Sequence, residues 1–155
     1  MADVVSNTGP LIALAQIDRF DLLRRLFGRI VIPPAVRAEI QDGGSEAALT
    51  AADWITVRPP QDTLAAQLLG EVLVAGESAT IILASELGAD LVLIDERTAT
   101  RKARALGLPV IGTLGVLLLG KRAAHLSAIK PLLDSLYDQV LRDAGESDDA
   151  SLSAP

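Results

Sequence analysis

Short, uninterrupted apolar runs alternate with longer segments of helical pattern along this chain. The runs do not alternate polar with apolar residues, as a strand with one solvated face does. Continuous apolar strands are typical of a parallel sheet that is covered by helices on both faces. The sequence therefore predicts an α/β fold. The apolar runs cover residues 4–5, 30–32, 54–57, 91–94 and 110–111.

Helical patterns fill the intervals between these runs. Pro33-Pro34 ends one run and opens a helix, and Gly88 and Gly107 are placed as helix stops. We expect helices over residues 11–15, 19–27, 35–40, 46–52, 63–69, 77–87, 98–106, 114–122 and 127–142.

The length of 155 residues suits one domain with a real core. We predict this domain over residues 1–142. Residues 143–155 are small, acidic and unpatterned, so we expect them to form a disordered tail. Aromatic residues make up 3% of the chain, so the core must be built from aliphatic side chains and few rings remain for stacking on bases.

The composition excludes several kinds of site. The chain has no cysteine, which excludes disulfides and thiolate zinc sites, and its one histidine, His125, precludes a His-rich metal centre. We expect His125 to be a surface or structural residue. The longest apolar stretch, residues 110–120, is too short to span a bilayer, and the N-terminus lacks a positively charged leader. We therefore expect a cytoplasmic protein without membrane contact.

Four polar sites stand where an apolar run stops or a short helix is expected. Strand ends and helix starts can aim side chains into one cleft, and carboxylate and amide oxygens suit hard divalent cations. We therefore expect one residue of each site to bind the metal, provided that the four sites lie close together in space. The sites are Ser6-Asn7-Thr8, Glu39, Gly76-Glu77-Ser78 and Asp95-Glu96.

Each site also has a plain structural interpretation. Asn7 and Asp95 are good helix N-caps, Glu77 suits the positive end of a helix dipole, and Glu39 is an ordinary solvated glutamate. Metal binding is the better interpretation if the first and fourth strands are neighbours, because Asn7 and Asp95 then lie together at the carboxyl edge of the sheet. The helices that carry Glu39 and Glu77 would flank this cleft.

Four segments, in this order and spacing, resemble PIN-domain proteins, and the similarity covers nearly all of residues 2–136. They are most similar to an uncharacterised prokaryotic PIN-like branch akin to VapC-type toxin ribonucleases. The segments are Val-Val-Ser-Asn-Thr-Gly-Pro from residue 4, Ile-Pro-Pro-Ala-Val-Arg-Ala-Glu-Ile from residue 32, Gly-Glu-Ser-Ala-Thr from residue 76 and Leu-Val-Leu-Ile-Asp-Glu from residue 91.

The resemblance implies a three-layer α/β/α fold whose parallel sheet of about five strands has the order 3-2-1-4-5. It also implies an acidic pocket that holds Mg²⁺ or Mn²⁺ and cleaves single-stranded RNA. Glu39, Glu77 and Asp95 match three acidic positions of the family and are the expected catalytic residues. Asn7, also an expected metal ligand, matches the first of the family's acidic positions, where most active members carry Asp; an amide can ligate a metal but brings no charge and cannot act as a base.

Neighbouring side chains complete the expected site. Thr8 and Ser78 are expected to orient metal ligands, Glu96 to replace part of the missing charge, and Arg97 and Arg101 to hold the RNA backbone. By resemblance, the protein is expected to act as a homodimer that a small antitoxin restrains.

Two alternatives remain open at this stage. The first is a PIN-like RNA-binding or regulatory module that has lost catalysis through Asn7. The second is a receiver-like regulatory domain, which shares the α/β pattern and an acidic cleft. That second fold needs a phosphoacceptor Asp after a strand with a lysine late in the chain, and Lys121 follows apolar helix-like residues instead.

Overall fold

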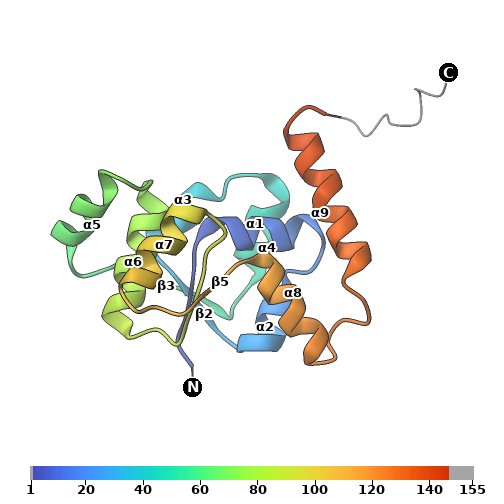
Figure 1. Cartoon of the computed structure of the whole chain (residues 1–155), viewed down its shortest axis with the longest axis horizontal. Helices are drawn as coiled ribbons and strands as arrows, with labels where there is room; N and C mark the ends of the chain where they lie inside the picture. The colour runs from blue at the N-terminus through green and yellow to red at the C-terminus, as the bar shows by residue number, and fades with distance from the viewer. Residues whose placement is uncertain (1, 147–155) are drawn as a thin grey trace.

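A five-stranded parallel sheet forms the centre of the protein, in a computed structural model that describes residues 2–146 (Figure 1). Its strand order, β3-β2-β1-β4-β5, confirms the predicted order. Each strand overlaps one of the predicted apolar runs. The strands are β1 (Val4–Ser6), β2 (Ile30–Ile32), β3 (Ile55–Val57), β4 (Leu91–Leu93) and β5 (Val110–Ile111).

The central strand, β1, pairs with β2 on one side and with β4 on the other. Val5 lies opposite Val31 and Val92, and Ser6 lies opposite Leu93. All three residues of β1 are buried. A central strand that is covered on both faces has no solvated side, which explains why its sequence does not alternate.

Nine helices surround the sheet within residues 2–146, each close to a predicted helix. Three helices, α1, α4 and α9, begin three residues from the predicted start, and α1 begins at Thr8 rather than at residue 11. Pro10 falls in its first turn, where the missing N–H leaves no hydrogen bond unmade. The helices are α1 (Thr8–Gln16), α2 (Asp21–Phe27), α3 (Pro34–Glu39), α4 (Gly43–Ala51), α5 (Thr63–Gly70), α6 (Ala75–Leu87), α7 (Arg97–Ala105), α8 (Thr113–Arg122) and α9 (Lys130–Asp143).

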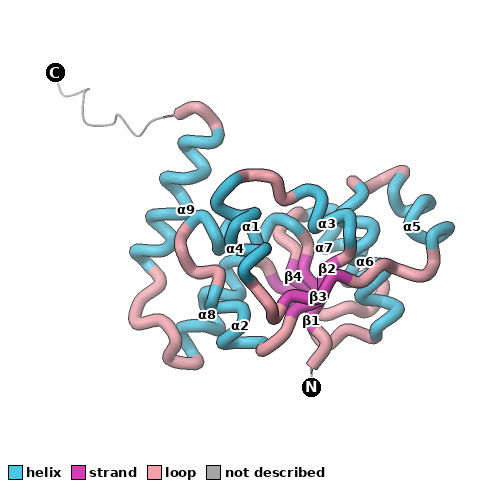
Figure 2. The backbone as a smooth tube through the Cα atoms, turned by 180° about the vertical axis from the view of Figure 1, so that it is seen from behind, coloured by secondary structure: helices cyan, strands magenta, loops and turns pink. Residues whose placement is uncertain are grey.

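Two hydrophobic clusters, one on each face of the sheet, make the fold three-layered. Successive side chains of a strand point to opposite faces, so Val4 joins one cluster and Val5 joins the other. The first cluster contains residues of α1, α2, α8 and α9, and the second contains residues of α6 and α7. The three-layer α/β/α architecture is thus confirmed, and Figure 2 shows these helices on the two sides of the strands.

The last helix, α9, ends at Asp143, one residue beyond the predicted domain boundary. Residues 147–155, most of the predicted tail, lie outside the described residues. Within the described chain, every helix is too short or too polar to cross a membrane.

Candidate active site at the carboxyl edge of the sheet

Asn7 and Asp95 follow two neighbouring strands and lie at the same edge of the sheet. The N–H of Asn7 donates to the carbonyl oxygen of Leu93 at 2.9 Å, and Asp95 comes two residues after Leu93. A Cβ atom placed on Gly9, in the first turn of α1, would lie 3.4 Å from Oδ2 of Asp95. The structure therefore brings the start of α1 and the end of β4 together, as the parallel-sheet argument requires.

Asn7 occupies the N-cap position of α1, yet its side chain makes no capping hydrogen bond. The residue is 6% exposed, and its Oδ1 atom is buried without a hydrogen-bond partner among the described residues. An unpaired buried acceptor costs on the order of 1–3 kcal/mol. Capping therefore does not explain Asn7, whose free oxygen has the chemistry of a metal ligand.

Glu39, the last residue of α3, is hydrogen-bonded to two other helices, α1 and α6. Its Oε2 accepts a hydrogen bond from the hydroxyl of Thr8 at 2.5 Å, and its Oε1 accepts one from the N–H of Gly76 at 2.9 Å. A Cβ atom on Gly76 would overlap this carboxylate. Glu39 is therefore a positioned side chain rather than a freely solvated one, and the Thr8 hydroxyl is one of its two donors.

Glu77 lies in the first turn of α6 and is partly buried. Burial raises the pKa of its carboxyl group, and the nearby charges of Glu96 and Glu39 raise it further, while a hydrogen bond from the Val74 backbone opposes them. Like charges near Glu77 disfavour its ionised form, and a bound cation would relieve that effect. The electrostatics therefore couple Glu77 to Glu96 and Glu39.

Ser78 follows Glu77 in the sequence but lies in a different environment. It is 2% exposed, and its hydroxyl donates to the carbonyl oxygens of Val74, at 3.1 Å, and Leu73, at 3.5 Å. These bonds fix the first turn of α6, which carries Glu77. The structure thus gives Ser78 an indirect connection to the site.

Asp95 is held by Thr113, a residue that the sequence analysis did not select. Oδ1 accepts from the N–H of Thr113 and Oδ2 from its hydroxyl, both at 2.6 Å. A Cβ atom on Gly112 would lie 2.6 Å from Oδ1, so this close approach requires glycine. The available signal was the position of Gly112-Thr113 directly after an apolar run, as at Ser6-Asn7-Thr8 and Asp95-Glu96.

Glu96 provides the cap that was considered for Asp95. As the N-cap of α7, it accepts hydrogen bonds from the N–H groups of Thr98, at 2.8 Å, and Ala99, at 2.7 Å. The bonds from Ala99 and Thr98, with a smaller effect of the Arg101 charge, lower the pKa of Glu96. Glu96 is therefore ionised at neutral pH and holds the start of α7 beside Asp95.

Arg97 and Arg101 lie one turn apart on α7 and are exposed. Neither forms an ion pair with any residue in the range 2–146. Side chains at i and i+4 share one face of a helix. The two guanidinium groups therefore present unpaired positive charge on the helix that begins at the acidic edge.

The side-chain oxygens at this edge are of the type that hard divalent cations prefer, although they do not form a complete coordination site. Among residues 2–146, no three Asp, Glu or His side chains lie close enough to share a metal ion. Thr113 and the Thr8–Gly76 pair hold Asp95 and Glu39 in place. The unpaired Oδ1 of Asn7 and the mutual repulsion of the glutamates are what a cation would relieve.

The chain belongs to the PIN domain family, whose model matches residues 3–146. PIN domains are typically nucleases that act on RNA and use divalent metal ions. Among solved structures, the chain is similar to a PilT N-terminus domain protein from the hyperthermophilic archaeon Sulfolobus solfataricus. That match has 20% identity over 83% of this chain and 96% of the other, with a TM-score of 0.44. Comparison with curated proteins finds no match.

Proposed function

We propose that this PIN domain is a metal-dependent endoribonuclease that cleaves single-stranded RNA. The observation that carries the proposal is the buried, unpaired Oδ1 of Asn7 at an edge that also presents Glu39, Glu77 and Asp95. A buried unsatisfied oxygen is unfavourable, as is a partly buried carboxylate with like charges near it, and a cation bound at this edge would relieve both. The family membership supports a nuclease.

In this proposal Asn7, Glu39, Glu77 and Asp95 hold Mg²⁺ or Mn²⁺. When bound there, the metal would supply Lewis-acid chemistry, activating the attacking water and offsetting charge on the scissile phosphate, and the products would carry 5′-phosphate and 3′-hydroxyl ends. Thr113 and Thr8 fix the carboxylates of Asp95 and Glu39 through the hydrogen bonds described above. Fixed carboxylates reduce the reorganisation that the reaction requires.

The RNA backbone would lie along α7. Arg97 and Arg101 offer guanidinium groups that no carboxylate of the described chain occupies, and phosphate contacts of this kind bind without reading sequence. Because aromatic residues make up only 3% of the chain, base stacking contributes little. Binding should therefore weaken steeply with added salt.

An RNA-binding or regulatory module with weakened catalysis is the second candidate, and Asn7 favours it. An amide leaves the site one negative charge short of a set of four carboxylates and cannot act as a base. Both candidate functions use the RNA-binding surface on α7. They differ in whether RNA is cleaved at the metal site.

We further propose that the protein is a toxin component that forms a homodimer and that a small antitoxin protein restrains. Exposed apolar side chains support protein partners: Leu64 and Leu68 on α5 are 64% and 59% exposed, and Tyr137 and Val140 on α9 are 58% and 64% exposed. The two helices lie at opposite ends of the molecule in Figures 1 and 2. Leu68→Glu and Tyr137→Glu, compared by light scattering, would show which surface pairs two copies.

A cleavage assay tests the nuclease. Labelled RNA, single-stranded or annealed to its complement, is incubated with the protein and Mn²⁺, Mg²⁺ or EDTA. We expect cleavage of the single strand with metal only, loss of cleavage in Glu39→Gln, and retention in Glu71→Gln, a matched control at an exposed glutamate. RNA that is bound but never cut would support the second candidate instead.

A further inference from the structure

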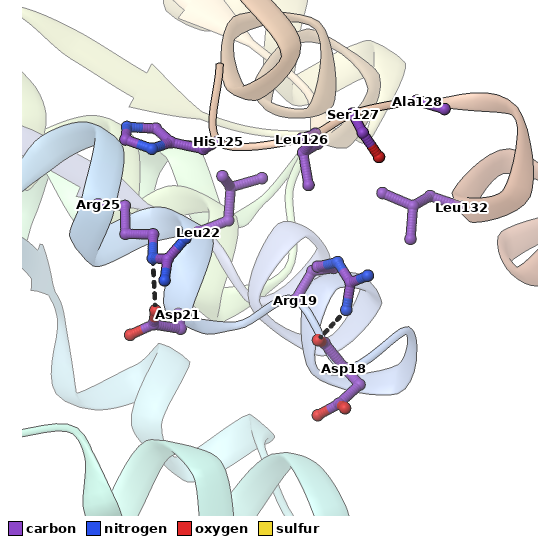
Figure 3. Close-up of a pocket in the computed structure, with 10 residues that line it drawn as sticks. All are labelled: Asp18, Arg19, Asp21, Leu22, Arg25, His125, Leu126, Ser127, Ala128 and Leu132. Carbon is purple, nitrogen blue, oxygen red and sulfur yellow. Dashed lines mark hydrogen bonds and ion pairs between the residues drawn. The ribbon is translucent and has the colours of Figure 1, made fainter. Parts of the chain in front are cut away.

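A cavity of about 320 Å³ lies between the turn that joins α1 to α2 and the loop that joins α8 to α9 (Figure 3). α1 and α8 each begin at the candidate active site, at Thr8 and Thr113, and each ends beside this cavity. At 1.5 Å per residue, the two helices place the cavity roughly 13–15 Å from that site. The lining residues are Asp18, Arg19, Asp21, Leu22, Arg25, His125, Leu126, Ser127, Ala128 and Leu132.

The two helices end in the same way at the cavity. In α1, Asp18 N–H bonds to the carbonyl of Ala15 and Arg19 N–H to that of Leu14; in α8, the N–H groups of residues 124 and 125 make the equivalent bonds. Both helices therefore close with a Schellman motif. The left-handed position, usually glycine, is Asp18 in α1 (φ 57°) and alanine in α8 (φ 60°). The residues that follow, Arg19 and His125, both line the cavity.

Leucine side chains form the apolar part of the cavity. Leu22 and Leu132 are 3% and 7% exposed, and Leu126 packs beside them. Gly120 of α8 makes this arrangement possible, because a Cβ there would lie 2.9 Å from Leu22 and 3.1 Å from Leu126. The wall against α8 is therefore closely fitted, which suits the apolar part of a small ligand.

Free hydrogen-bond donors face this apolar surface. Arg19 uses one nitrogen, Nη1, to reach the carbonyl oxygen of Asp18 at 2.9 Å, and Arg25 uses Nε to reach Asp21 at 3.0 Å. Their remaining N–H groups, like the hydroxyl of Ser127, make no hydrogen bond to another described residue. In Figure 3 the guanidinium of Arg19 lies on the side of Ser127 and Leu132, and His125 lies above Arg25.

Arg19 has no carboxylate partner at the cavity. The charged side chains of the lining are two arginines, Arg19 and Arg25, and two aspartates, Asp18 and Asp21, so they balance formally. Both oxygens of Asp21 are occupied, by Arg24 and Arg25, and in Figure 3 the carboxylate of Asp18 points away from Ser127 and Leu132. Arg19 forms no ion pair with another residue in the range 2–146, so its guanidinium is available to an anionic ligand.

We propose that this cavity is a second binding site, distinct from the candidate active site, for a phosphomonoester on a small organic body. Arg19 and Ser127 bind the phosphate, the leucines contact the body, and Arg25 and His125 donate to its oxygens. Guanidinium groups bind phosphate with several N–H donors at once, and Arg19 has such donors free. The ligand is either a free mononucleotide or the 5′-phosphate end of an RNA strand.

Calorimetry in EDTA tests the site without any metal-dependent cleavage. AMP, adenosine, and a short RNA with a 5′-phosphate or a 5′-hydroxyl are titrated into wild type and variants. We expect AMP to bind at least tenfold more tightly than adenosine. We expect Arg19→Gln and Ser127→Ala to weaken AMP binding, the former about tenfold, and Arg29→Gln, an exposed arginine outside the cavity, to change it less than twofold.

The RNA arms separate the two sources of the phosphate. A 5′-phosphorylated strand that binds more tightly than both AMP and the same strand with a 5′-hydroxyl assigns the site to RNA ends, and equal affinities of the two strands assign it to free nucleotides. The proposal is overturned if AMP shows no binding at 10 mM, if adenosine binds as tightly as AMP, or if folded Arg19→Gln matches wild type. Asp95→Asn should leave AMP affinity unchanged. The AMP-binding proposal and the nuclease proposal can therefore fail independently of each other.

Discussion

Thr113 donates two hydrogen bonds to the carboxylate of Asp95, one from its backbone N–H and one from its hydroxyl, each 2.6 Å long. The pair ties the end of β4 to the first residue of α8. Asp95 therefore supports the fold as well as the candidate site, and its removal would leave a 5%-exposed threonine without its acceptor. Changes at Thr113 separate these roles better than changes at Asp95.

We expect Thr113→Val to lower the free energy of unfolding by about 1 kcal/mol, because the hydroxyl bond is lost while the shape is retained. Cleavage should also fall, since Asp95 loses the donor that orients it. Thr113→Ser keeps the hydroxyl and serves as the control. Urea unfolding and the RNA assay measure both effects, and equal behaviour of the valine and serine variants would show that the hydroxyl has no orienting role.

Gly76→Ala should displace Glu39, because the new Cβ would occupy the position of its carboxylate. Alanine normally stabilises a helix relative to glycine by about 1 kcal/mol, so a loss of stability here would identify the steric conflict. Gly70→Ala is the matched control, because its Cβ would lie 3.9 Å from the Ser78 hydroxyl, an ordinary contact. We expect loss of cleavage and a lower melting temperature in the first variant only.

Stability should depend on pH through Glu77. Its pKa is raised from the ordinary value of 4.5, so the folded state holds the proton more tightly than the unfolded state. Stability is therefore lost as the pH rises from about 4.5 through the folded-state pKa. In EDTA, Glu77→Gln should melt slightly above wild type at pH 7, on the order of 1 °C, and equal to it near pH 4. A variant that melts below wild type at pH 7 would contradict the repulsion.

Asn7→Asp should strengthen metal binding and weaken the metal-free fold. The new carboxylate would be buried beside like charges, which costs about 1–3 kcal/mol at pH 7 without metal. Mn²⁺ should restore the melting temperature, and any weak nuclease activity should increase. Thermal melts with and without Mn²⁺ measure this. Unchanged melting in both conditions would mean that Asn7 only shapes the turn.

The strands and helices were predictable from sequence because the signals are local. Five apolar runs without alternation indicated buried parallel strands, and glycine or proline marked several helix ends. The strand order came from the resemblance, since periodicity does not say which strands are neighbours. The start of α1 was placed three residues late, and Pro10 lies in its first turn, where proline is tolerated.

The candidate site was partly predictable for the same reason. Asn7 and Asp95 follow strands, so the parallel sheet places them at one edge. The partnerships of Glu39 with Gly76 and of Asp95 with Thr113 join residues 37 and 18 positions apart. Such contacts depend on how helices pack, and local pattern does not encode them. Glu96 as the cap of α7 was missed because two adjacent carboxylates compete for one cap position.

A Mn²⁺ titration tests the central claim, that this edge of the sheet binds a divalent cation. Calorimetry would compare wild type with Glu77→Gln and with the exposed control Glu71→Gln. We expect saturable binding to wild type and to Glu71→Gln, and affinity for Glu77→Gln at least about tenfold weaker, which corresponds to about 1.4 kcal/mol. Absence of binding to wild type, or equal affinities of wild type and Glu77→Gln, would contradict the metal site and the nuclease proposal that rests on it.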